Sequence, residues 1–252
     1  MPTFGICRIQ ALRLTGEQSL IIGDYMFTES EMTADSLRVF LAPAEYVDSN
    51  DPDILSAAKE IAPRGSASEK ARALFYAVRD LRYQAKNFDD LGEYRASSVL
   101  KRRRGYCVGK ASLFVAFSRA AGIAARPAFA DVRNHLASPR LREMMNTDLF
   151  AWHGYAEVAL SGRWVKVSPT FDARLCRQHG VAPLEFDGES DALLQSFDDS
   201  GRSMTYVKQH GAFHDIPARF LVAELNRLYP RVCTAMREGT FSPDRAPEAE
   251  DG

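Results

Sequence analysis

The chain lacks the long apolar runs and the charge excess that would place it in several large classes of protein. No stretch approaches the roughly 18 apolar residues that a membrane-spanning helix needs, and the first residues have no apolar centre followed by a small-residue cleavage site. Lys and Arg number 32 against 33 Asp and Glu, whereas general binding to polyanions needs a basic surface. We therefore predict a protein that binds neither membranes nor nucleic acids.

Cysteine is scarce and scattered. The four cysteines are Cys7, Cys107, Cys176 and Cys233, and no two of them form a C-x-x-C pair. This spacing predicts neither a disulfide framework nor a zinc site, and nothing else in the sequence indicates a metal or another cofactor. Free thiols are typical of a reducing compartment, so we expect a cytoplasmic protein.

With 46% hydrophobic residues, the 252-residue chain can bury a large core. The order of patterns predicts an N-terminal extension over residues 1–40, a core over 41–180, an extension packed on that core over 181–242, and a disordered Pro-rich acidic tail over 243–252.

The predicted helices precede the predicted strands. Helical periodicity marks residues 50–62, 65–83 and 94–105 and a further helix from about Cys107, and the spacing of Ser66 and Glu69 fits a capping box. From His153 onward, two strand-like runs meet at Ser161-Gly162, which predicts a β-hairpin. Helices followed by strands favour an α+β fold.

Cys107 stands at the start of the apolar helix and after three arginines, Arg102 to Arg104. Unpaired N–H groups, the helix dipole and these cations would favour a thiolate, as a nucleophile requires. The alternative is an inert packing residue, because free cysteine is among the most buried residue types.

A cysteine nucleophile needs a base, and the hairpin supplies His153, shielded by Trp152. The second strand brings Ser168 and Asp172 back alongside, where either could hold Nδ1 of His153. The alternative is a structural histidine.

Elsewhere, Arg126 and Asp131 flank an apolar strand and suggest an ion pair.

Three segments carry a resemblance: "GYCVGKASLFVAFSRAAGIAARP", "HGYAEVALSGRWVKVSPTFD" and, before them, "RALFYAVRDLRYQ". They resemble the transglutaminase-like superfamily, in which G-x-C opens an apolar helix and a histidine precedes E-V, G-x-W and a D-P-T-like end. The resemblance covers residues 40 to 180. It implies a papain-like core, with the nucleophile helix packed on an antiparallel sheet.

By this resemblance Cys107 is the nucleophile and His153 the base. Ser168 stands where the family often has Asp, so Asp172 is our preferred third member and Ser168 the other candidate. The Cys107 N–H, with Gln84 or Tyr106, would stabilise the oxyanion.

The implied function is acyl transfer or hydrolysis of an amide through a Cys thioester, on a peptide, a protein or a small amide. The rival is a non-catalytic binding domain with a degraded triad, which Ser168 motivates. A third hypothesis, nucleic-acid binding by "KRRRG", conflicts with the balanced charge.

Overall fold

The computed structural model describes residues 34–134, 137–193 and 204–241. The predicted N-terminal extension and the acidic tail therefore lie almost entirely outside the described residues, and the limits drawn at 41, 180 and 242 stay predictions. None of the described helices is long and apolar enough to cross a membrane.

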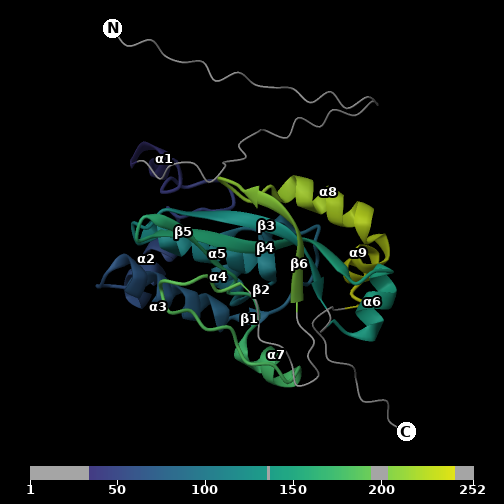
Figure 1. The fold of residues 1–252 in the computed structure, drawn as a ribbon. Coiled ribbons are helices and arrows are strands. Elements are labelled where there is room, and N and C mark those ends of the chain that lie inside the picture. Colours follow the sequence, from purple (N-terminus) through teal and green to yellow (C-terminus); the bar gives the residue numbers. More distant parts are fainter. Residues whose placement is uncertain (1–33, 135–136, 194–203, 242–252) are drawn as a thin grey trace, which may run out of the picture.

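The first half of the described chain is mainly helical (Figure 1). Its elements are α1 (Ala34–Val39), α2 (Pro52–Ile61), α3 (Ala67–Arg79), β1 (Arg82–Tyr83), the 3₁₀ turn η1 (Leu91–Glu93), α4 (Ala96–Arg102), β2 (Arg104–Gly105) and α5 (Cys107–Ala120). Local rules explain several of these boundaries. Asp51 caps α2 by accepting from Asp53 N and Ile54 N, and the predicted Ser66–Glu69 capping box begins α3.

The second half contains the sheet. Its elements are β3 (Ala125–Asn134), α6 (Pro139–Met145), β4 (Leu149–Leu160), β5 (Arg163–Val167), α7 (Ala173–Gln178), β6 (Met204–Ala212), α8 (Ala218–Leu228) and α9 (Pro230–Arg237). Four of the strands form an antiparallel sheet in the order β5-β4-β3-β6. The predicted hairpin is confirmed, since Leu160 pairs with Arg163 and both turn residues have positive φ, 48° at Ser161 and 79° at Gly162.

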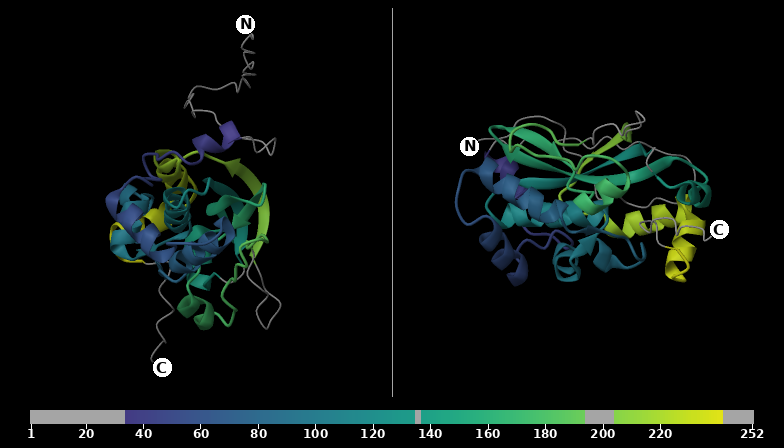
Figure 2. Two further views of the ribbon diagram at one scale, coloured as in Figure 1. Left: turned by 90° about the vertical axis from the view of Figure 1, so that its left-hand side faces the viewer. Right: turned by 90° about the horizontal axis from the view of Figure 1, so that it is seen from below.

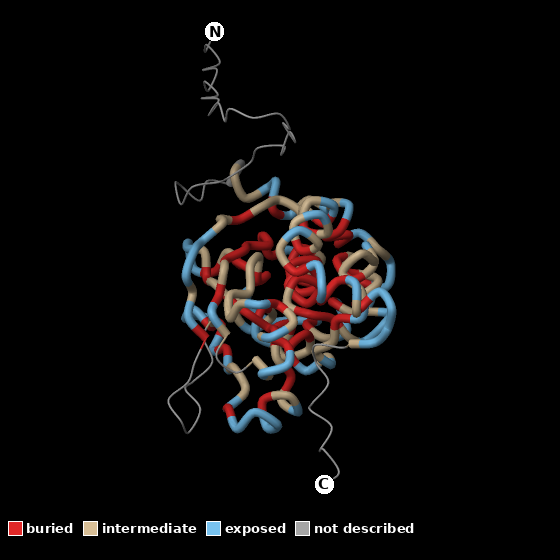
Figure 3. The backbone as a smooth tube through the Cα atoms, turned by 90° about the vertical axis from the view of Figure 1, so that its right-hand side faces the viewer, coloured by how far each residue is buried: buried red, intermediate tan, exposed pale blue. Residues whose placement is uncertain are grey.

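Helices α2 to α5 lie on one face of the sheet, so the predicted α+β fold is confirmed (Figure 2). Helix α5 is central, and every residue from Val108 to Arg119 is buried (Figure 3). The main hydrophobic cluster fills the space between these helices and the sheet, and α8 and α9 contribute to it. A small second cluster, centred on Tyr155, covers part of the other face.

Strand β6 is an edge strand of this same sheet, paired with β3. Part of the segment after residue 180 is thus built into the sheet that carries His153.

Candidate active site

Cys107 is the first residue of α5, as the sequence predicted, and is half-buried. The N-cap residue, Tyr106, makes no side-chain capping bond. The first-turn N–H groups are therefore not used by a cap, as they usually are at a helix start. Burial has the largest effect on the pKa of the Cys107 thiol and raises it, whereas the backbone N–H groups of Gly154 and Val108 act to lower it. The helix start and β4 thus meet at this thiol.

Two glycines allow α5 to pack closely against its neighbours β4 and η1, and the sequence analysis missed both. A Cβ at Gly154 would lie 2.8 Å from Val108 Cα, and one at Gly109 would lie 2.3 Å from the carbonyl oxygen of Glu93. Real Cβ atoms do not come so close to backbone. Either side chain would push α5 away from its neighbour. The sequence contains these glycines in the patterns G-x-C-x-G and H-G, but only the packing shows why glycine is needed at both positions.

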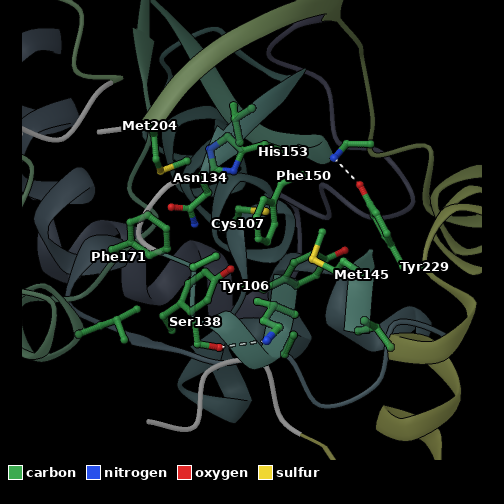
Figure 4. Close-up of a pocket in the computed structure, with 18 of the residues that line it drawn as sticks. Tyr106, Cys107, Asn134, Ser138, Met145, Phe150, His153, Phe171, Met204 and Tyr229 are labelled. Atoms are coloured by element: carbon green, nitrogen blue, oxygen red, sulfur yellow. Dashed lines mark hydrogen bonds between the residues drawn. The ribbon is translucent and has the colours of Figure 1, made fainter. Parts of the chain in front are cut away.

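His153 lies in β4, buried, and faces the same cavity as Cys107 (Figure 4). Its Nε2 is 3.4 Å from Ser168 Oγ, and Ser168 Oγ is 2.8 Å from Thr170 Oγ1. The orienting contact was expected at Nδ1 but is made at Nε2. Nδ1 is therefore the ring nitrogen that Ser168 does not use.

Asp172 has a different place from the one that the sequence suggested. Its carboxylate accepts hydrogen bonds from Tyr83 N at 2.7 Å and Leu175 N at 2.9 Å. It is the N-cap of α7, the position where aspartate satisfies free N–H groups. The turn after Pro169 thus begins a helix, which directs the carboxylate to α7 and β1. Among the described side chains, it is Ser168 whose hydrogen bond reaches His153.

The directions of the pKa shifts do not favour the expected thiolate. Burial raises the pKa of Cys107 to about 11 and lowers the pKa of His153 to about 4. The nearby arginines do not counteract this, because Glu93 binds Arg102 at 3.0 Å and Arg104 at 2.8 Å. At neutral pH the site therefore holds a thiol and a neutral imidazole.

Trp152, just before His153, has a left-handed backbone with φ of 58°. Its N–H donates to Asp131 Oδ1 at 3.1 Å, and His210 Nε2 lies 2.6 Å from the same oxygen. The indole stacks on the His210 ring at 4.0 Å with 10° between planes. Asp131 therefore pairs with His210 and not with Arg126, which binds Glu157 at 2.6 Å.

The three other predicted site residues differ in position. Tyr106 and Trp152 line the cavity, and the buried hydroxyl of Tyr106 has no hydrogen-bond partner of normal geometry among the described residues. Gln84 is not one of the described residues that line the cavity; its backbone N–H donates to Gly105 O at 3.0 Å.

Lys110, one turn after Cys107, was missed as a site-building residue. It is fully buried, and Nζ donates to the carbonyls of Arg79, Leu81 and Thr170 at 2.9, 2.8 and 2.6 Å. Burial lowers its pKa to about 7. Lys110 thus ties α5 to the end of α3 and to the turn that carries Ser168 and Thr170.

Beside Cys107 and His153 lies a cavity of about 220 Å³. Aromatic and aliphatic side chains form most of its lining, among them Phe150, Phe171, Met145 and Met204 (Figure 4).

These features define an α+β protein with a cysteine at the N-terminus of its central helix and a histidine on the adjoining antiparallel sheet. Residues 56–169 match the family model of the Transglutaminase-like superfamily, and the chain therefore contains a transglutaminase-like superfamily domain. This match covers Cys107, His153 and Ser168, and ends before Asp172.

One solved structure, described as a "putative cysteine protease" from Cytophaga hutchinsonii, aligns with 71% of this chain at 19% identity and a TM-score of 0.43. The alignment spans 55% of that protein, little more than half of its length. A comparison with curated proteins found no match.

Proposed function

We propose that the protein is a cysteine-dependent enzyme that cleaves an amide or peptide bond through a thioester on Cys107, with water as the preferred acceptor. The observation that carries the proposal is the placement of Cys107, at an uncapped helix start, in one cavity with His153. The family match over both residues supports it.

In this proposal the proton moves as the bond forms. Cys107 Sγ attacks the carbonyl carbon while its proton passes to Nδ1 of His153, and His153 then gives that proton to the leaving amine. A neutral imidazole has one N–H, so Nδ1 is a base only when Nε2 carries the hydrogen. Nε2–H then donates to Ser168 Oγ, and the Ser168 hydroxyl donates to Thr170 Oγ1.

The oxyanion would form beside the N-terminus of α5. The N-terminus of α5 has no side-chain cap, so its first-turn N–H groups are available to the oxyanion, and the helix dipole favours negative charge there. Tyr106, whose buried hydroxyl has no hydrogen-bond partner of normal geometry within the described part of the chain, is our preferred side-chain donor over Gln84.

A second candidate function rests on a specific observation. The hydrogen-bond partner of His153 among the described residues is a serine, which cannot stabilise imidazolium by charge. A non-catalytic domain that binds its ligand in the same cavity is the function that this feature favours.

The test is acylation by p-nitrophenyl acetate. We expect a stoichiometric burst of p-nitrophenolate, with the acetyl group on the peptide that contains Cys107, and slow turnover afterwards. His153→Ala should slow the burst by about 10²- to 10⁴-fold. Cys233→Ala, at another buried free thiol, is the matched control and should leave the burst unchanged. Acylation of Cys107 no faster than that of Cys176 or Cys233 would support the binding domain instead.

A further inference from the structure

We infer that the cavity beside Cys107 holds the acyl group of the substrate, and that this group is uncharged, apolar and about the size of one aromatic ring. The covalent part of this inference rests on the proposed function. The shape and chemistry of the cavity carry the part that concerns binding.

The cavity has no charged residue type other than histidine among the described residues that line it: Asp, Glu, Lys and Arg are all absent. Its polar lining side chains are few, and most of its wall consists of rings and aliphatic chains. Moving an unpaired charge from water into such surroundings is strongly unfavourable. An acyl group with a carboxylate or an ammonium would therefore lose its hydration here and meet no Asp, Glu, Lys or Arg among the described lining residues.

Much of the wall comes from outside the residues that match the superfamily. Phe171, Leu175, Met204, Leu225, Tyr229 and Val232 all line the cavity, and all follow residue 169. These residues are added by the segments that carry α7, β6, α8 and α9. The selectivity of this cavity therefore depends in part on this chain's own later segments.

Two hydrogen bonds fix this wall to the strand that bears His153. The hydroxyl of Tyr229, at the junction of α8 and α9, donates to Leu149 O at 2.9 Å and accepts from Ala151 N at 2.7 Å (Figure 4). Tyr229 is mostly buried. Since β4 carries both partners, the apolar wall and the base are held in one arrangement.

The volume sets the size of the acyl group. An apolar cavity of about 150 Å³ is large enough to bind benzene, and this one measures about 220 Å³. A phenylacetyl or hexanoyl group therefore fits, whereas an acetyl group leaves most of the space empty. A group bonded to Cys107 Sγ starts at the wall of the cavity and extends into it.

The first experiment compares acylation of Cys107 by the p-nitrophenyl esters of acetate, hexanoate, phenylacetate and adipate, the last as its monoester. Sγ forms the bond to the acyl carbon, and p-nitrophenolate leaves. At about fourfold per buried methylene, hexanoyl should react on the order of 100-fold faster than acetyl. The adipoyl ester, equal in chain length to the hexanoyl ester but ending in a carboxylate, should react little faster than the acetyl ester. Equal rates for all four esters would overturn the inference and leave the proposed function standing.

Two variants locate the effect in the cavity. Val232, buried on α9, lines it, whereas Thr234 on the same helix is exposed. Val232→Phe should reduce the hexanoyl preference to below about tenfold, and Thr234→Phe should leave it unchanged. Leu225→Ala, which enlarges the cavity, should shift the preference to longer chains. If Val232→Phe and Leu225→Ala both keep the wild-type preference, as the control Thr234→Phe should, the cavity is not the acyl site.

Binding without chemistry separates the two proposals. In full-length Cys107→Ala protein, calorimetry should detect hexanamide and phenylacetamide but not adipamate, and Val232→Phe should weaken the binding of both amides. If the amides bind in this way but no ester acylates the native chain, the apolar cavity is supported and the proposed enzymatic function is overturned. If the amides do not bind, the inference about the cavity fails.

Discussion

Two histidines of one sheet differ in the group that each contacts. His210 on β6 meets the carboxylate of Asp131 at 2.6 Å, whereas His153 on β4 meets the hydroxyl of Ser168 at 3.4 Å. Within the described residues, the sheet therefore contains a close histidine–carboxylate pair, but not at the histidine that shares a cavity with the cysteine. That pair holds Trp152, and Trp152 precedes His153 in the chain.

The difference indicates how the site would work. Burial of His153, which has no carboxylate partner among the described residues, favours the neutral imidazole, and burial of the thiol beside it favours the protonated form. We therefore expect concerted proton transfer during attack, not a standing thiolate–imidazolium pair. In this view the Asp131–His210 pair holds Trp152, and through it His153, in position, and Ser168 selects the tautomer of His153.

The largest expected difference in acylation rate is between His153→Ala and His210→Ala. His153→Ala removes the base and should slow acylation of Cys107 by about 10²- to 10⁴-fold. His210→Ala removes the stacking partner of Trp152 and the imidazole that contacts Asp131, both away from the reacting atoms, and should slow acylation by less than about tenfold. Burst kinetics with p-nitrophenyl acetate measure both. Equal losses in the two variants would show that His153 is not the base.

Gly154→Ala should have the next largest effect on acylation, because the new Cβ would meet Val108 Cα at 2.8 Å. The start of α5 must then move from β4, and a displacement of about 1 Å at reacting atoms lowers rates by about 10²-fold. The His210–Asp131 pair should not change, so the His210 NMR signals serve as an internal control. An unchanged burst would mean that α5 adjusts without moving Cys107.

Asp131→Ala should have a smaller effect on acylation, because Asp131 holds Trp152, and through it His153, in position. The substitution leaves the partly buried Trp152 N–H and His210 Nε2 without their acceptor, and each group left unsatisfied costs up to about 1–3 kcal/mol. The left-handed backbone of Trp152 then loses its support. We expect a lower melting temperature and a roughly tenfold lower kcat with little change in KM for a hexanoyl ester.

Asp131→Asn keeps an oxygen for the Trp152 N–H and should recover most of that rate. Asp148→Ala removes an exposed partner of Arg133 and should change neither rate nor stability, as is usual for surface ion pairs. If Asp131→Asn lowers kcat as much as Asp131→Ala does, the negative charge matters and not the hydrogen bond to Trp152.

Short-range rules were enough to predict much of the fold. The Ser66–Glu69 capping box, the helix from Cys107 and the Ser161-Gly162 turn depend on residues a few positions apart, and the structure confirms each. The placement of Cys107 and His153 in one cavity followed from the resemblance of two separate segments.

Long-range packing decided what the sequence could not. Whether Ser168 or Asp172 reaches His153 depends on the chain direction after Pro169, and that direction is set where α7 begins. The charges of Arg102 and Arg104 are offset by Glu93, brought close by the short turn η1. The apolar wall from α8 and α9 lies more than a hundred residues after Cys107.

The pH dependence of acylation follows from the state of His153. Its pKa is lowered to about 4, so the imidazole is neutral and able to accept a proton above that pH. Acylation should be nearly constant from about pH 5 to 8 and fall as the pH drops through about 4. Stopped-flow bursts in constant-ionic-strength buffers test this. A midpoint near 6.5, the pKa of an exposed histidine, would show that His153 is more hydrated than its burial indicates.

Ser168 offers the smallest change and the sharpest test of the comparison. Ser168→Ala removes one neutral hydrogen bond, worth about 0.5–1.5 kcal/mol, so acylation should fall by about three- to tenfold. Ser168→Asp gives His153 the kind of partner that His210 has. A carboxylate within about 4–6 Å raises the pKa of imidazole by about 1–3 units, so the midpoint of the pH profile should rise from about 4 toward neutrality. If the midpoint of Ser168→Asp stays at about 4, residue 168 does not face the imidazole in solution, and a different group sets the tautomer of His153.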